Sequence, residues 1–147
     1  MPASYRDVNI LIVDDDQVDV RGIQRGLTKQ KISNPVFVAS DGQEALDMLR
    51  GANGRERVPH PYLILLDLNM PRMNGIRFLE EIRQDAELED SIVFVLTTSG
   101  SDEDKLAAYH QHIAGYVVKA DAGAEFLNLI QMLERFVITV QFPPEHH

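Results

Sequence analysis

The sequence contains no cysteine among its 147 residues. Disulfides, cysteine nucleophiles and cysteine metal sites are therefore excluded. It also contains no apolar run that approaches the roughly 20 residues of a membrane-spanning helix. The amino-terminal stretch MPASYRDVN lacks the pattern of a secretory signal peptide. These absences predict a cytoplasmic protein without a membrane segment.

Positive charge is scarce in the chain. There are 14 lysines and arginines against 23 aspartates and glutamates, and the formal net charge is −9. A nucleic-acid-binding domain normally carries a basic patch or stripe, so the composition argues against a nucleic-acid partner. With 44% hydrophobic and 25% charged residues, the chain is otherwise typical of a soluble globular protein of one domain.

Short apolar segments alternate with longer amphipathic segments along the chain. The short segments are continuously apolar, which is typical of strands in a parallel sheet covered on both faces. The longer segments repeat apolar residues with helical spacing. This alternation predicts an α/β fold, with a doubly wound five-stranded parallel sheet, helices on both faces and no second domain. The predicted strands cover residues 8–13, 35–39, 62–66, 91–98 and 114–120, and the predicted helices cover residues 17–30, 40–51, 74–85, 101–112 and 122–136.

Polar side chains follow several of the predicted strands. Asp14 and Asp15 follow the first strand, Asp67 follows the third, Thr97 ends the fourth and Lys119 ends the fifth. These groups should meet, because functional residues of an open parallel sheet gather at the carboxyl ends of its strands. Two carboxylates about 4 Å apart repel by about 4 kcal/mol at an effective dielectric constant of 20, so the cluster needs a cation. An all-oxygen site suits Mg²⁺, and a carboxylate beside that ion can accept a phosphoryl group.

Each of these residues also has an ordinary structural interpretation. An aspartate after a strand is commonly a turn residue or a helix cap. Thr97 alone would be a strand-end hydroxyl, and Lys119 alone would be a solvated surface lysine. Asp16 is predicted to be solvated or to start a helix. The joint placement at successive strand ends, and no single residue, favours a chemical role for Asp67.

Four segments, in this order, resemble the receiver domain of two-component response regulators: ILIVDDD, LILLDLNMPRMNG, VFVLTT and GYVVK. The resemblance covers about residues 7–136. It implies a flavodoxin-like fold with strand order 2-1-3-4-5, a histidine kinase as partner and Mg²⁺ as cofactor. It also implies signalling by phosphorylation-dependent protein–protein contacts. Such a protein is not an enzyme with metabolic turnover, because it catalyses only its own phosphorylation and dephosphorylation.

The resemblance further implies roles for individual residues near the predicted acidic cluster. Asp67 is similar to the phospho-acceptor. Asp14 and Asp15 are similar to the acidic pair that positions Mg²⁺, with Asp15 as the direct ligand. Asn69, two residues after the acceptor, would offer its backbone carbonyl to the metal.

Three more residues take their implied roles from the later motifs. Thr97 is similar to the switch hydroxyl, Tyr116 to the switch aromatic coupled to it, and Lys119 to the lysine that binds the phosphoryl group. Pro71 and Gly75 match the turn that follows the acceptor. For Tyr116 the alternative is an ordinary place at the edge of the core.

The chain departs from common receivers at two internal positions. Ala120 stands where a proline usually follows the lysine. We expect a trans Lys119–Ala120 bond, because a cis bond before a residue other than proline costs about 3 kcal/mol. Residues 51–61 form a long polar segment rich in glycine and proline, and we expect a loop there.

A third departure is an apolar tail. We expect a receiver domain at residues 1–136 and a tail at 137–147, whose final histidines suggest an expression tag. Two periodicities compete in it: alternation favours an extended segment that ends before Pro143, and the apolar spacing also fits a continued helix. The extended form is the preferred prediction. An exposed apolar tail needs a surface to cover it, on its own domain or on a second copy, and we hypothesise a homodimer.

Together these departures resemble the single-domain receivers that work with phytochrome-type histidine kinases. A downstream phosphotransfer or effector protein is the other expected partner. Two alternative functions stay open: a receiver-like binding module that is never phosphorylated, and an aspartate-nucleophile phosphatase. The phosphatase is disfavoured, because Asn69 stands where those enzymes carry a second acid.

Overall fold

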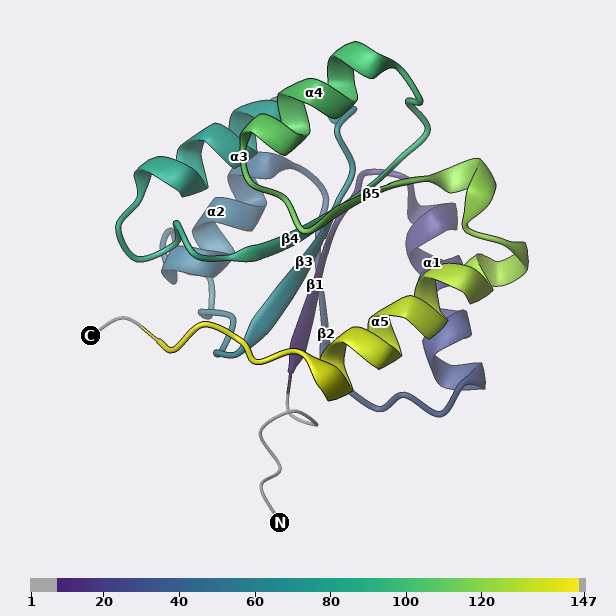
Figure 1. Cartoon of the computed structure of the whole chain (residues 1–147). Helices are drawn as coiled ribbons and strands as arrows, with labels where there is room; N and C mark the ends of the chain where they lie inside the picture. Colours follow the sequence, from purple (N-terminus) through teal and green to yellow (C-terminus); the bar gives the residue numbers. More distant parts are fainter. Residues whose placement is uncertain (1–7, 146–147) are drawn as a thin grey trace.

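Five parallel strands form one sheet with the order β2-β1-β3-β4-β5 (Figure 1). This order confirms the predicted flavodoxin-like, doubly wound α/β fold. The computed structural model describes residues 8–145, so the expectations that concern residues 1–7 and the histidines at 146–147 lie outside it. The strands are β1 (Asn9–Val13), β2 (Val36–Ala39), β3 (Tyr62–Leu66), β4 (Ile92–Thr97) and β5 (Gly115–Val118).

Two neighbouring interior strands, β1 and β3, are buried along their whole length. Their apolar residues face helices on both sides, which is why the sequence shows no alternation there. The pairing aligns Val13 with Leu66. The residues that follow these two positions, Asp14 and Asp67, therefore leave the sheet side by side at its carboxyl edge.

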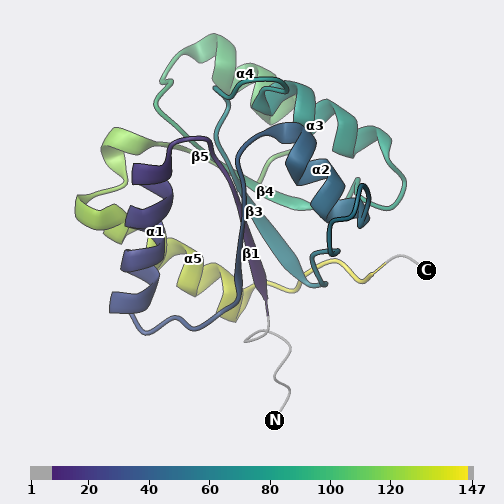
Figure 2. The ribbon, with the colours of Figure 1, turned by 180° about the vertical axis from the view of Figure 1, so that it is seen from behind.

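Helices cover both faces of the sheet, as Figures 1 and 2 show from opposite sides. One face carries α1 (Gln17–Lys29) and α5 (Leu127–Thr139), and the other carries α2 (Gly42–Arg50), α3 (Gly75–Gln84) and α4 (Asp102–His110). Each layer has its own apolar core. No helix within residues 8–145 combines the length and the apolar character needed to cross a membrane.

Four helices begin at a side chain that caps their free backbone N–H groups. Asp16 caps α1, Asp41 caps α2, Asn74 caps α3 and Ser101 caps α4. Such a cap stabilises a helix by about 1 kcal/mol. For Asp16 the structure thus supports the helix-starting alternative.

Two glycines allow α1 to pack closely against α5 and against the residue that precedes α5. A Cβ atom on Gly22 would lie 2.9 Å from the Phe126 ring, and one on Gly26 would lie 2.1 Å from Ile130 Cδ1. Glycine weakens α1 by roughly 1 kcal/mol at each position. In return the two segments approach closely enough to bury Ile130 completely.

The last helix starts later than predicted. A short 3₁₀ turn, η2 (Lys119–Asp121), replaces the end of the strand predicted to reach residue 120, and a second, η3 (Ala124–Phe126), lies where a helix was expected to begin at residue 122. Glu125 and Phe126 have φ angles of 51° and 58°, which interrupt helical geometry. Continuous helix begins at Leu127.

The preferred prediction of an extended tail is wrong for its first residues. Helix α5 continues to Thr139, because its core-facing spacing extends as far as Val137, which is buried. After the helix, Phe142 folds back so that its ring packs against Phe136 at a centroid distance of 5.7 Å. Ile138 and Val140 stay exposed on the surface.

Both internal departures from common receivers behave as predicted. Residues 51–61 form an irregular loop, anchored where the buried Val58 donates its amide to Met48 at 3.0 Å. Within residues 8–145 the cis peptide bond is His60–Pro61, so the Lys119–Ala120 bond is trans.

Candidate functional site

The end of β1 places two carboxylates in different surroundings. Asp14 is buried and its Oδ1 accepts the Asp16 amide at 2.8 Å, whereas Asp15 is exposed. The Asp14 amide donates to Ala39 on β2, which extends the strand pairing by one residue. The backbone therefore fixes Asp14 rigidly, while Asp15 faces solvent next to it.

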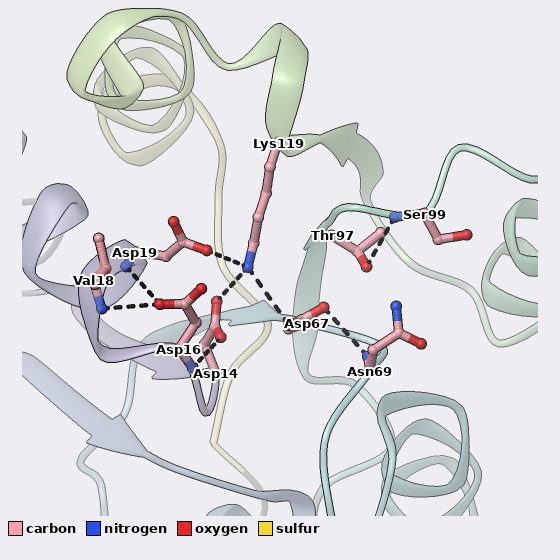
Figure 3. Close-up of polar contacts among 9 residues, drawn as sticks. All are labelled: Asp14, Asp16, Val18, Asp19, Asp67, Asn69, Thr97, Ser99 and Lys119. Atoms are coloured by element: carbon pink, nitrogen blue, oxygen red, sulfur yellow. Dashed lines mark hydrogen bonds and ion pairs between the residues drawn. The ribbon is translucent and has the colours of Figure 1, made fainter.

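Asp67 follows β3 and is held by the neighbouring strand and by its own turn. Its amide donates to Val13 at 2.9 Å, and its Oδ1 accepts the Asn69 amide at 3.3 Å. Its side chain is buried. The turn also requires Gly75, where a Cβ atom would lie 2.6 Å from the Asp67 carbonyl oxygen. The sequence thus presents one fixed carboxylate at the centre of the edge (Figure 3).

The turn after Asp67 is tied to the start of α2. Arg72, at a φ of 61°, donates through Nε to the buried carboxylate of Asp41 at 2.8 Å. The Gly42 amide donates to the Met73 carbonyl at 3.2 Å. Burial alone would raise the pKa of Asp41, but the Glu44 amide and Arg72 outweigh it and lower that pKa. The ion pair and the backbone bond hold the turn in place beside Asp67.

Three carboxylates are arranged to share a cation. Asp14, Asp15 and Asp67 each offer one oxygen, and these oxygens lie within 4.8 Å of one another. A donor set of oxygens alone fits a hard divalent cation such as Mg²⁺. The clustering predicted from the strand ends is therefore present. The roles of single residues, including the backbone carbonyl of Asn69, stay predictions.

Lys119 crosses from the end of β5 to the same cluster (Figure 3). Its Nζ lies 2.7 Å from Asp19, 2.9 Å from Asp14 and 3.5 Å from Asp67. Burial by itself lowers the pKa of Lys119, but the three carboxylates outweigh it and raise that pKa, so the ammonium stays charged. Lys119 is no solvated surface lysine, since its side chain is only 10% exposed.

Burial also has a strong effect on the pKa of Asp14. Loss of solvent raises its pKa from 3.8 to about 6, and the charge of Asp67 adds to the rise. The Asp16 amide and Lys119 oppose the rise without cancelling it. In the metal-free site Asp14 therefore takes up a proton more readily than an ordinary aspartate.

Thr97 and Tyr116 each form a hydrogen bond with the backbone of the same loop residue, Ser99. Thr97 is fully buried, and its Oγ1 accepts the Ser99 amide at 3.4 Å. The Tyr116 hydroxyl donates to the Ser99 carbonyl at 2.8 Å. Burial raises the pKa of Tyr116, so the phenol stays protonated as a donor. Ser99 also donates through its own hydroxyl to Asp104 on α4.

Sequence reasoning missed Asp19 and Ser99. Asp19 had a local signal, because it is the third residue after the capping Asp16, a position whose side chain reaches back toward the helix start. Its partner Lys119 lies 100 residues away in the sequence, and no local pattern predicts that pairing. Ser99 contacts Thr97 and Tyr116 through its backbone amide and carbonyl, and the identity of a side chain does not predict such backbone bonds.

Comparison with known proteins gives a family match over most of the chain. The sequence model of the response regulator receiver domain matches residues 10–131. Response regulator Rcp1 of Synechocystis sp. is 36% identical over 135 residues, which are 91% of this chain and 92% of that protein. The chain thus spans nearly the whole length of this relative.

Two solved structures of similar proteins extend the match to the fold. The Mn²⁺-bound form of Rcp1 is 35% identical and has a TM-score of 0.82, covering 93% of this chain and 99% of that one. The phosphorylated cyanobacterial phytochrome response regulator RcpA is 31% identical with a TM-score of 0.83, at the same coverage. One of these relatives binds a divalent metal and the other carries a phosphoryl group.

Proposed function

The chain belongs to the response regulator receiver family, and on that premise we propose that it accepts a phosphoryl group on Asp67 from a histidine kinase. It would act as a single-domain response regulator and signal through protein–protein contacts that change on phosphorylation. One observation carries the proposal. Asp67 is a buried carboxylate whose oxygen lies within 4.8 Å of oxygens of Asp14 and Asp15, close enough for the three to bind one cation. It also lies 3.5 Å from the Lys119 ammonium.

The transfer is a displacement at phosphorus. A carboxylate oxygen of Asp67 attacks the phosphorus atom, the new P–O bond forms as the P–N bond to the kinase histidine breaks, and the electron pair leaves with the imidazole nitrogen. Lys119 and the Thr97 hydroxyl are the side chains that would hold phosphoryl oxygens. Later attack by water releases phosphate and restores Asp67, so the chain completes only its own cycle and is no metabolic enzyme.

Mg²⁺ is the proposed cofactor. Asp14, Asp15 and Asp67 would hold it, together with the backbone carbonyl of Asn69. When bound, the ion would neutralise charge on the phosphoryl oxygens during transfer. The fit rests on the oxygen-only donor set and on the 4.8 Å spacing. The Mn²⁺-bound structure of the relative Rcp1 supports the binding of a divalent ion.

The switch would run through Thr97, Ser99 and Tyr116. The Thr97 hydroxyl accepts the backbone amide of Ser99, and the Tyr116 hydroxyl donates to the backbone carbonyl of the same residue. If Thr97 turns toward a phosphoryl group on Asp67, it releases the Ser99 amide, and the Tyr116 hydroxyl bond then holds the loop less firmly. A local charge would thereby change the loop between β4 and α4, which is what a phosphorylation switch requires.

The partner we propose is a phytochrome-type sensor kinase in the cytoplasm. RcpA is described as a phytochrome response regulator, and this chain resembles it over 93% of its length. A downstream phosphotransfer or effector protein would receive the signal. We also propose a homodimer that involves the apolar tail, because Ile138 and Val140 remain exposed at the end of α5.

Intact-mass measurement tests the proposal. With Mg²⁺ and a small phosphodonor such as acetyl phosphate, the parent protein should gain one phosphoryl group and Asp67→Asn should gain none. An equal adduct on both proteins would place the acceptor elsewhere. If neither protein forms an adduct although Mg²⁺ binds and rapid hydrolysis is excluded, the phosphorylation-independent binding module is the better description.

A further inference from the structure

Among residues 8–145, the carboxylate nearest to the Lys119 ammonium belongs to Asp19, on the first turn of α1. The Nζ–Oδ2 distance is 2.7 Å to Asp19, compared with 2.9 Å to Asp14 and 3.5 Å to Asp67 (Figure 3). The ammonium therefore lies closer to the carboxylate on α1 than to that of Asp67, while staying within ion-pair distance of both.

The position of Asp19 is fixed by the helix start. Asp16 Oδ1 accepts the amides of Val18 and Asp19, at 2.9 and 3.3 Å. The negative side chain also lies in the first turn, where the helix dipole stabilises it. Asp19 is thus a preplaced counter-charge and not a mobile surface acid, with only 23% of its side chain exposed.

Asp19 differs from the other two partners of Lys119 in one respect. Asp14 and Asp67 belong to the three-carboxylate cluster that fits a metal, and Asp19 does not. A metal and the ammonium therefore compete for Asp14 and Asp67, while Asp19 serves the ammonium alone. A lysine ammonium has three N–H donors, so a bond to Asp19 leaves others for a phosphoryl oxygen.

We propose that Asp19 is a positioning residue that takes up part of the pairing of the Lys119 ammonium, so that the ammonium lies beside Asp67 and pairs less fully with the metal-binding carboxylates. Asp14 and Asp67 then stay available to the metal, and a phosphoryl group on Asp67 meets an ammonium already in reach. This inference rests on the proposed function of Asp67 and adds a residue that the family motifs did not indicate.

Without Asp19, the ammonium should pair more fully with Asp14 and Asp67 and oppose metal binding more strongly. Loss of one negative charge near the site would also weaken metal binding, but it would do so whether or not Lys119 is present. A double-mutant cycle separates the two explanations. The four proteins are the parent, Asp19→Asn, Lys119→Met and the double variant. Asp19→Asn keeps the shape of the side chain and leaves the Asp16 cap intact.

The experiment measures Mg²⁺ affinity of the four metal-free proteins by calorimetry, because the chain has no tryptophan to report binding. Asp19→Asn should weaken Mg²⁺ binding about tenfold when Lys119 is present, and by less than about twofold in the Lys119→Met background. Asp19→Glu, which keeps the charge, should stay within about threefold of the parent. Thermal melting of each variant confirms that it is folded.

Two results would overturn the inference: an unchanged affinity in Asp19→Asn, or an equal loss in both backgrounds, which would reduce Asp19 to a distant charge. The proposed function is tested separately, by whether the parent protein forms the phosphoryl adduct. A parent without an adduct would refute the role of Asp67, whereas the four affinities would still decide the role of Asp19.

Discussion

The hydroxyl of Tyr116 donates to the backbone carbonyl of Ser99 at 2.8 Å, and this bond joins β5 to the loop that follows β4. The Ser99 amide in turn reaches Thr97 at 3.4 Å. The aromatic residue and the strand-end hydroxyl are therefore linked through the backbone of one residue, Ser99, although no direct bond between them is needed.

Replacing Tyr116 with phenylalanine should remove this link and leave the acceptor site intact. We expect Tyr116→Phe to lower the free energy of unfolding of the unphosphorylated protein by about 1 kcal/mol, the usual net value of one hydrogen bond. A phosphoryl adduct should still form. Urea unfolding and intact mass check the two parts. Tyr109→Phe, at an exposed tyrosine of α4, is the control and should change neither. Loss of the adduct in Tyr116→Phe would contradict the separation of switch and acceptor.

Any side chain at Gly75 should lower the stability of the protein. A Cβ atom there would lie 2.6 Å from the Asp67 carbonyl oxygen and 2.7 Å from Leu68 Cα, and backbone atoms cannot move aside cheaply. Gly75→Ala should therefore destabilise the protein by about 3 kcal/mol and slow adduct formation, because the turn that holds Asp67 must shift. Gly100→Ala is the matched control, since its Cβ would meet only Val118 Cγ2 at 3.8 Å. Equal unfolding free energies for both variants would refute the argument.

The stability of the metal-free protein should depend on the protonation of Asp14. Its pKa is about 6 in the folded protein and 3.8 without burial, so the folded state binds the proton more tightly than the unfolded state. Stability must then fall as the pH rises from about 4 to about 6, by at most about 3 kcal/mol. Chemical unfolding in the presence of a chelator measures this. Asp14→Asn should lack that part of the pH dependence, and an unchanged slope in the variant would show that other groups cause it.

Metal binding should show the opposite dependence on pH. A carboxylate must be ionised to hold Mg²⁺, so affinity should rise as the pH passes through about 6, where Asp14 loses its proton. Calorimetric titration at several pH values checks the direction. A pH-independent affinity between about 5 and 8 would mean that Asp14 does not need to ionise for the metal to bind.

The homodimer proposal concerns the exposed end of α5. Ile138→Glu should keep the fold, because Ile138 is 53% exposed, but should convert a dimer to a monomer in light scattering. Deleting the whole tail would be a poorer test, since Val137 and Phe142 pack against the protein's own core. Leu106→Glu, at an equally apolar exposed position on α4, should leave the mass unchanged. If light scattering finds that the parent protein is already a monomer, the homodimer proposal is refuted.

Much of the site could be predicted because it follows directly from buried strands. The runs that end at Val13 and Leu66 are apolar throughout, and any parallel sheet brings the next residues to one edge. Asp14 and Asp67 were therefore expected together, and they are. The capping roles of Asp16 and Asp41 follow equally from local chemistry.

The errors lie where local patterns compete or where the decisive contact is distant. Both helical and extended periodicities fit residues 136–142, and burial of Val137 against the α1 side of the sheet decides for the helix. The late start of α5 depends on the left-handed backbone of Glu125 and Phe126, which neither residue type favours. The contact of Asp19 with Lys119 joins segments 100 residues apart.

Chemical mapping of the phosphorylated residue tests the central claim most directly. An aspartyl phosphate is an acyl phosphate, which borohydride reduces so that the aspartate becomes homoserine. After treatment with Mg²⁺, acetyl phosphate and borohydride, peptide mass spectrometry should find homoserine at position 67 of the parent and nowhere in Asp67→Asn. Homoserine at Asp14 or Asp15, or a phosphoryl group that resists reduction, would contradict Asp67 as the acceptor.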